Sequence, residues 1–201
     1  MPPPSPTLVI LAGGASRRLG ACKALVTLGP DTPLGHLLAA GVVLGSTPPI
    51  VVAGRHFEEL AAAVPPGARL IHNREWERGR TSSIQAAREA APGRDLCLAP
   101  VDVPLVPAAV FEALAEAWAG AGSPSRGWLA PHVVQGGRQC FGHPVVLGSA
   151  LLEEIAAEAP DRALRDFRSL ASPLWSIPVA GNEILDDLDR PEDLERLLSR
   201  F

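Results

Sequence analysis

Short apolar runs rich in strand-forming residues alternate with longer stretches of helical pattern along most of the chain. The apolar runs predict strands at Thr7–Ala12, Pro49–Ala53, Arg69–His72, Leu96–Ala99, Gly127–Ala130, His143–Leu147 and Leu174–Pro178. The longer stretches predict helices at Pro33–Leu44, Glu58–Val64, Ser82–Ala90, Pro107–Gly120, Ser149–Ala157, Arg162–Ala171 and Arg190–Ser199. This order is typical of a single-domain α/β fold, so we expect a doubly wound, mostly parallel sheet with helices on both faces. Ligands of such folds bind at the carboxyl ends of the strands, so the loops after Ala12 and Pro100 should line one crevice.

The size and composition of the chain fit one globular domain. Its 201 residues are 47% hydrophobic, which is enough for a single core that buries about 70% of the unfolded surface. We predict that residues 7–201 form the domain. Residues 1–6 contain three consecutive prolines and are expected to be disordered.

Composition also excludes several classes of partner. The net charge is −4 and the sequence contains no basic block, so we do not expect nucleic acid as a partner. No apolar run reaches the roughly 18 residues of a membrane span, and the first residues lack a signal-peptide pattern. We therefore predict a soluble, cytoplasmic protein with no membrane partner. Cys22, Cys97 and Cys140 are widely spaced and odd in number, which indicates neither a disulfide framework nor a zinc site.

A glycine-rich loop follows the first predicted strand. The stretch Leu11–Lys23 contains three glycines and three basic residues: Gly13, Gly14, Gly20, Arg17, Arg18 and Lys23. Glycines let backbone N–H groups approach phosphate oxygens, and the basic side chains supply positive charge. The spacing matches neither the P-loop nor the G-x-G-x-x-G pattern. We interpret the loop as a phosphate-binding cradle, with a purely structural strand-to-helix turn as the alternative.

This loop resembles the LAGG-x-S-x-R-x-G-x-x-K loop of the MobA-like nucleotidyltransferases, which transfer a nucleoside monophosphate to a phosphorylated acceptor and release pyrophosphate. Leu19 stands where that family usually has Met. The resemblance implies that the nucleotide contacts the start of the loop, at Leu11, Ala12, Gly13 and Gly14. It also implies two catalytic cations: Arg18 on the β- and γ-phosphates, and Lys23 between the α-phosphate and the phosphate of the acceptor.

An acidic residue follows the predicted strand Leu96–Ala99. Asp102 lies in a turn stiffened by Pro100 and Pro104, close to the expected crevice. A hard cation such as Mg²⁺ takes carboxylate and phosphate oxygens, although an Asp here could instead cap a turn or helix. The family has its metal-binding Asp in a similar D-x-P turn, so the resemblance implies that Asp102 is a catalytic residue and a Mg²⁺ ligand.

A second acidic cluster, Asp186–Asp193, precedes the last predicted helix. Acids at the start of a helix are favourable for capping and for the helix dipole, so the cluster alone does not indicate a metal. It is similar to the family's D-I-D-T-P-E-D-L, with Arg190 where Thr is common. The match implies that Asp187 is the second metal ligand and that Asp189 caps the helix, while Asp186 and Asp189 remain alternative ligands.

The middle of the chain resembles the molybdopterin cytidylyltransferase branch of the family. Its N-x-x-W-x-x-G-x-x-x-S pattern matches Asn73, Trp76, Gly79 and Ser83. The resemblance implies nucleotide contacts at Asn73, Gly79 and Ser83, with the Ser83 hydroxyl at a helix N-terminus beside the base or ribose. Trp76 either packs or stacks.

Two further segments resemble the family's acceptor-side P-x-x-G-x-R-G-H-P-V region. They are the glycine pair before Arg138 and the turn Gly142–Val145. The match assigns Arg138 and His143 to the acceptor side. A lone histidine is more often a hydrogen-bonded structural residue than an acid or base. The reaction also gives His143 little proton chemistry to do, because an attacking phosphate oxygen is already ionised and needs alignment more than proton removal.

These features predict a nucleotidyltransferase that uses Mg²⁺ and a nucleoside triphosphate, with a molybdenum-cofactor acceptor such as molybdopterin and a molybdoenzyme as a possible recipient. The Ser83 segment favours CTP, whereas Leu11 and Ala12 match the guanylyltransferase branch. The alternatives are a molybdopterin guanylyltransferase, a sugar- or polyol-phosphate nucleotidyltransferase, and a non-catalytic scaffold that binds the cofactor.

Overall fold

The computed structural model describes residues 5–45, 47–158 and 161–201, so residues 1–4 of the stretch expected to be disordered lie outside it. The strands are β1 (Thr7–Ala12), β2 (Ile50–Ala53), β3 (Arg69–His72), β4 (Leu96–Pro100), β5 (Trp128–Gln135), β6 (Arg138–Phe141), β7 (Val145–Leu147) and β8 (Leu174–Pro178). The α-helices are α1 (Pro33–Gly41), α2 (Phe57–Ala63), α3 (Arg80–Ala90), α4 (Ala108–Gly120), α5 (Ser149–Ala156) and α6 (Pro191–Leu198). Five short 3₁₀ helices are η1 (Lys23–Leu25), η2 (Val42–Leu44), η3 (Trp76–Arg78), η4 (Leu164–Leu170) and η5 (Glu183–Leu185). No helix in these three ranges is long and apolar enough to cross a membrane.

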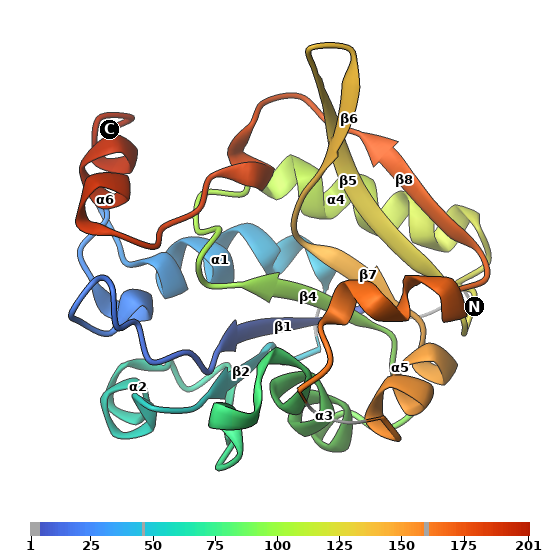
Figure 1. Cartoon of the computed structure of the whole chain (residues 1–201), viewed down its shortest axis with the longest axis horizontal. Coiled ribbons are helices and arrows are strands. Elements are labelled where there is room, and N and C mark those ends of the chain that lie inside the picture. Colours follow the sequence, from blue (N-terminus) through green and yellow to red (C-terminus); the bar gives the residue numbers. More distant parts are fainter. Residues whose placement is uncertain (1–4, 46, 159–160) are drawn as a thin grey trace.

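One mixed sheet runs through the molecule (Figure 1). Its strand order is β3-β2-β1-β4-β7-β5-β6, and β8 pairs with β5. Strands β3, β2, β1 and β4 are parallel to one another, and β7 joins β4 and β5 by antiparallel pairing. The predicted single-domain α/β fold with a mostly parallel sheet is confirmed.

Helices cover both faces of the sheet because the central strands are apolar on both sides. In β1, Leu8 and Ile10 join a core cluster with residues of α1, α2 and α4. Val9 and Leu11 of the same strand face the opposite way, into a second cluster with residues of α3, α5 and η4. The alternation of side chains along a strand thus produces two core layers.

Two predicted elements differ most from the structure. The strand expected at Gly127–Ala130 extends to Gln135 and forms a hairpin with β6, turning at Gly136 and Gly137, both with positive φ. Pro131 sits within β5, where its carbonyl accepts a hydrogen bond from the Gly142 amide, a contact for which it needs no N–H. The α-helix expected at Arg162–Ala171 is instead the 3₁₀ helix η4, and Phe167 is its one buried residue.

The C-terminal segment is fastened to the loops at the carboxyl ends of β1 and β4. Leu28, Leu188 and Leu197 form a small apolar cluster, separate from the two main core layers. The Leu188 amide also donates a 2.7 Å hydrogen bond to the carbonyl of Asp102. These contacts place the acidic stretch before α6 next to the turn after β4.

We expect Leu188→Ala to loosen this segment. Removing a fully buried leucine costs about 2–5 kcal/mol of unfolding free energy, and here the loss should also weaken ligand binding, because the neighbouring Asp187 and Asp189 lose their anchor. Leu151→Ala, which is equally buried on α5 far from this segment, is the matched control. Denaturant unfolding should show a similar loss for both variants, and titration with nucleotide and metal should show weakened binding for Leu188→Ala alone. Equal ligand affinities in the two variants would contradict the anchoring role.

Candidate functional site

A deep hollow lies where β1 and β4, two neighbouring parallel strands, end. The chain passes from β1 to β2 on one side and returns through β4 on the other, which makes this edge a topological switch point. A cavity of about 610 Å³ opens here, lined by the glycine-rich loop after β1 and by the turn after β4. The prediction that these two loops line one crevice is confirmed.

A second cavity of about 390 Å³ adjoins the first. The two share Arg80 and Asp102, and the second is also lined by His143, Asp187 and Asp189. Asp102 therefore stands between two spaces, one large enough for a nucleotide and the other close to the segments assigned to the acceptor.

Two basic side chains at the edge of the crevice pair with one acid. Lys23 lines the large cavity, whereas Arg18 lines an adjoining hollow together with Lys23 and Asp189. Lys23 Nζ lies 2.6 Å from Asp189 Oδ1, and Arg18 Nη1 lies 3.2 Å from Asp189 Oδ2. The hydrogen bond from Lys23 lowers the pKa of Asp189 below its ordinary value. The Lys23 side chain is only 11% exposed, whereas that of Arg18 is 68% exposed, so the lysine is the more firmly positioned of the two.

The expectation that Asp189 caps the last helix is wrong. Arg190 occupies the N-cap position of α6, and the Asp193 carboxylate accepts from the backbone amides of Asp189 and Arg190. Asp193 reaches back one turn and satisfies these donors, so the Asp189 side chain is left to pair with Lys23 and Arg18.

The acidic side of the crevice contains a carboxylate oxygen with no protein partner. Asp102 Oδ1 is buried without a hydrogen bond, while Oδ2 lies 3.3 Å from Arg80 Nη2. Asp187 lies at the exposed rim of the second cavity, where partial desolvation on its protein side and the charges of Asp102 and Asp189 raise its pKa. An orphaned carboxylate oxygen beside a second, charge-repelled carboxylate fits a hard divalent cation.

The three candidate acids before α6 differ in their surroundings. Asp186 forms ion pairs with Arg196 and Arg200, beside α6. Asp189 forms ion pairs with Lys23 and Arg18. Asp187 and Asp189 both share a cavity with Asp102. The carboxylate of Asp189 is engaged by two cations, whereas desolvation and the charges of Asp102 and Asp189 raise the pKa of Asp187, so these surroundings favour Asp187 among the three.

The base side of the large cavity depends on close approach between the loop and α3. A Cβ on Gly13 would lie 2.7 Å from Ser83 Oγ, so the loop can lie this close only with glycine there. Asn73 is buried and donates to Ser82 Oγ (2.8 Å) and Ser83 Oγ (3.0 Å). Leu11, Ala12, Gly13, Gly14, Gly79 and Ser83 line the cavity. Asn73 does not line it and instead donates a hydrogen bond to Ser83, which does.

The two acceptor-side residues lie apart. His143 lines the second cavity, and its Nδ1 is buried without a hydrogen-bond partner. Arg138 begins β6 in the projecting hairpin at the top of Figure 1 and lines neither of these two cavities. The sequence pattern assigned both residues to the acceptor side. It does not show that Gly136 and Gly137 form a hairpin turn, which places Arg138 in the projecting hairpin and apart from His143.

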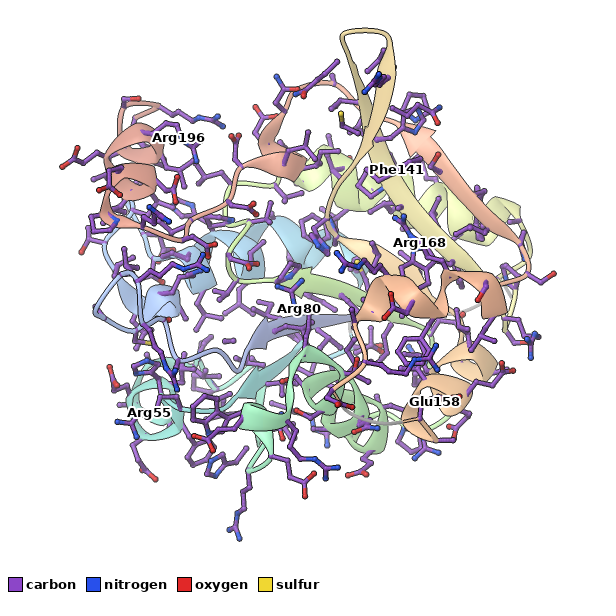
Figure 2. The ribbon with its side chains drawn as sticks, viewed as in Figure 1. Arg55, Arg80, Phe141, Glu158, Arg168 and Arg196 are labelled. Carbon is purple, nitrogen blue, oxygen red and sulfur yellow. The ribbon has the colours of Figure 1, made fainter. Side chains whose placement is uncertain are left out.

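Two lining residues, Arg80 and His56, were given no role by sequence reasoning. Figure 2 shows the Arg80 side chain near the centre of the molecule, close to the end of β4. Arg80 directly follows Gly79 in the segment that matches the family pattern, and this position could have indicated that its side chain lies near the site. His56 lines the large cavity just beyond the carboxyl end of β2, and its place after a parallel strand was the only hint of its position.

The His143 ring makes a testable contribution to stability. Its burial and the positive charge of Arg80 lower the pKa of His143 from 6.5 to about 4. Between pH 6.5 and pH 4 the His143 ring is protonated in the unfolded chain but stays neutral in the folded chain. The stability that is present at neutral pH is therefore lost as pH falls from 6.5 to 4. We expect His143→Gln to lose less unfolding free energy than the wild type between pH 7 and pH 4.5, by on the order of 1–3 kcal/mol in urea titrations. Parallel losses in the two proteins would contradict this.

Comparison with known proteins agrees with the geometry. A family model described as "MobA-like NTP transferase domain" matches residues 8–174. A sequence search of curated proteins finds no match. The match ends before Asp187, so the family model does not cover the acidic stretch ahead of α6.

Solved structures share the fold over nearly the whole chain. Rv0371c from Mycobacterium tuberculosis H37Rv is 24% identical with a TM-score of 0.78, covering 97% of this chain and 98% of its own. A manganese complex of the same protein has 21% identity, a TM-score of 0.76 and coverages of 98% and 100%. Molybdopterin-guanine dinucleotide biosynthesis protein A from Archaeoglobus fulgidus is 17% identical, with a TM-score of 0.73 and coverages of 96% and 97%.

The 4-diphosphocytidyl-2C-methyl-D-erythritol synthase from Anaerococcus prevotii DSM 20548 has 11% identity and a TM-score of 0.73, covering 96% of this chain and 94% of its own. These identities, all below 25%, establish a shared fold. The family match extends over most of the chain, from β1 to the first residue of β8. The chain therefore belongs to the MobA-like NTP transferase family.

Proposed function

We propose that this nucleotidyltransferase transfers a nucleoside monophosphate, preferentially from CTP, to a phosphorylated acceptor, molybdopterin or the molybdenum cofactor, and releases pyrophosphate. The observation that carries the proposal is the meeting of two cavities at Asp102, with basic side chains on the wall of the larger and acids around the smaller. A triphosphate in the first cavity and an acceptor phosphate in the second would meet at this carboxylate.

The glycine-rich loop binds the triphosphate in this proposal. When the triphosphate binds, Lys23 and Arg18 leave Asp189 and contact phosphate oxygens instead. Arg18 binds the β- and γ-phosphates, and Lys23 binds the α-phosphate. Lys23 suits the reacting phosphate because it is the less exposed of the two and is held by its ion pair. Fixed positive charge at that point stabilises the charge that develops on the leaving pyrophosphate.

Asp102 and Asp187 would hold the divalent cation, and Mg²⁺ is the ion that we propose. When bound, this ion supplies positive charge next to the phosphate oxygens. The orphaned oxygen of Asp102 and the raised pKa of Asp187 support the assignment. Rv0371c, which shares the fold, forms a complex with manganese, which agrees with a divalent ion.

The chemical step needs alignment rather than proton removal. An oxygen of the acceptor phosphate bonds to the α-phosphorus while the bond from that phosphorus to the bridging oxygen of pyrophosphate breaks. The attacking oxygen is already ionised, so a general base is unnecessary. The neutral His143 fits a structural role, and Arg80, between the two cavities, offsets the charge of the acceptor phosphate.

Asp102→Ala tests the catalytic assignment. Loss of one of two anionic ligands should reduce the rate of pyrophosphate release by about 100-fold or more, with little loss of unfolding free energy because the removed carboxylate is not part of the apolar core. Asp166→Ala, which removes a half-exposed carboxylate on η4, is the matched control and should retain wild-type rates. A rate for Asp102→Ala within a few-fold of the wild type would refute the catalytic role and favour a non-catalytic scaffold.

The base preference follows from the hydrogen bonds of Ser83. Asn73 donates to Ser83 Oγ, so the serine hydroxyl proton remains available for an acceptor such as cytosine O2. The A. fulgidus relative, named for a guanine dinucleotide, represents the competing preference, and the A. prevotii synthase represents a polyol-phosphate acceptor. We keep both as alternatives for the same site.

We expect CTP to bind more tightly than GTP by several kcal/mol, because a site built for one base leaves polar groups unpaired with another. Competition against a labelled nucleotide, with Mg²⁺ present, measures the ratio. Ser83→Ala should reduce the CTP preference, and Ser125→Ala, which lies outside the cavity, should leave it unchanged. Displacement by GTP at lower concentrations than CTP would overturn the cytidylyl preference without affecting the nucleotidyltransferase assignment.

A further inference from the structure

A second group of possible metal ligands lies on another wall of the large cavity. One ligand atom each from Cys22, His56 and Glu59 lie within 4.8 Å of one another. Cys22 precedes η1 in the glycine-rich loop, His56 precedes α2, and Glu59 lies in the first turn of α2. The three side chains thus converge from the loop and from the segment after β2.

The histidine ring is oriented as metal-bound histidines usually are. His56 Nδ1 lies 2.6 Å from Glu59 Oε1, and Nε2 lies 3.3 Å from the carbonyl oxygen of Ala15. Metal-binding histidines generally donate their second ring N–H to a carbonyl or carboxylate, which fixes the ring. At 2.6 Å the contact between Nδ1 and the Glu59 carboxylate contains a proton, which Nδ1 donates. A metal ion that replaced this proton would take Nδ1 and Glu59 as ligands and leave Nε2–H to donate to the Ala15 carbonyl.

The donor set indicates which ion would bind. Thiolate and imidazole ligands select zinc and related borderline ions, whereas Mg²⁺ takes oxygen ligands. We propose that Cys22, His56 and Glu59 bind one zinc-class divalent cation, at a site distinct from the carboxylate site at Asp102 and Asp187. Three protein ligands leave one tetrahedral position, and Cys22 and His56 both line the large cavity, so water or a ligand in the cavity completes the coordination.

The bound ion would connect the glycine-rich loop to α2. Cys22 directly precedes Lys23, so coordination of its sulfur fixes the backbone from which the lysine extends. Burial raises the pKa of the Cys22 thiol, so the metal-free protein keeps this thiol protonated. Binding releases that proton to solvent as the sulfur becomes a ligand.

Cobalt provides a direct probe of the site, independent of catalytic activity. Chelator-treated protein titrated with Co²⁺ should develop a thiolate-to-cobalt absorption band and the visible bands of tetrahedral cobalt, saturating at one ion per chain. Excess Mg²⁺ should leave the bands in place, and Zn²⁺ should abolish them. Cys22→Ser and His56→Ala should both lose the thiolate band.

Matched variants separate the possible outcomes. Cys140→Ser, in β6 and outside the cavity, and Asp102→Ala, at the other metal site, should keep the band. Glu59→Gln should keep it with affinity reduced by at least about tenfold, since loss of an outer-shell partner alone costs that much. No thiolate band, a band that survives both Cys22→Ser and His56→Ala, or a band abolished by Asp102→Ala would overturn the proposal. Circular dichroism of each variant checks folding, and His56→Ala keeps the test decisive if Cys22→Ser is unstable.

Discussion

Parallel pairing of β1 with β4 is the constraint on which the site depends. It brings the ends of two strands separated by more than eighty residues to one edge of the sheet, where one delivers the glycine-rich loop and the other delivers Asp102. Both strands are buried on both faces, so neither loop can move away without disturbing a core layer. The remaining parts of the site, α3 and the segment before α6, are attached to this pair.

Several charged side chains of the crevice form ion pairs within the protein. Asp189 pairs with Lys23 and Arg18, and Arg80 approaches Asp102. A triphosphate with its cation would replace these contacts with stronger ones between the same kinds of charge. Phosphate oxygens would take the place of the Asp189 carboxylate beside Lys23 and Arg18, and the metal ion would take the place of the Arg80 guanidinium beside Asp102. The binding free energy is therefore the difference between two sets of ion pairs, which makes affinity sensitive to ionic strength.

Local patterns predicted the parts of the fold that local sequence controls. The apolar run Thr7–Ala12 gave β1 with its observed bounds, and the cradle and Asp102 followed from their places after strands. The β5–β6 hairpin is also local, and its Gly136–Gly137 turn was an available signal. Two features depended on contacts between distant segments and were beyond such reasoning: the pairing of Asp189 with Lys23, and the cluster of Cys22, His56 and Glu59. The cysteine spacing did not indicate a zinc site because two of the proposed ligands come from a different segment. The roles proposed for Arg18, Lys23, Asp102, Asp187 and Ser83 remain predictions.

The fastening of the C-terminal segment has a consequence for motion. A small leucine cluster and the amide of Leu188 are among its anchors, whereas the strands of the sheet are each held by a ladder of bonds. Segments with few buried contacts open locally at a lower free energy than the whole domain. Transient release of this segment would move Asp187 away from Asp102 and, at the same time, Asp189 away from Lys23. The opening would widen the path by which a product with two nucleotide-sized halves could leave. Amide hydrogen exchange at Leu188 would report this local opening.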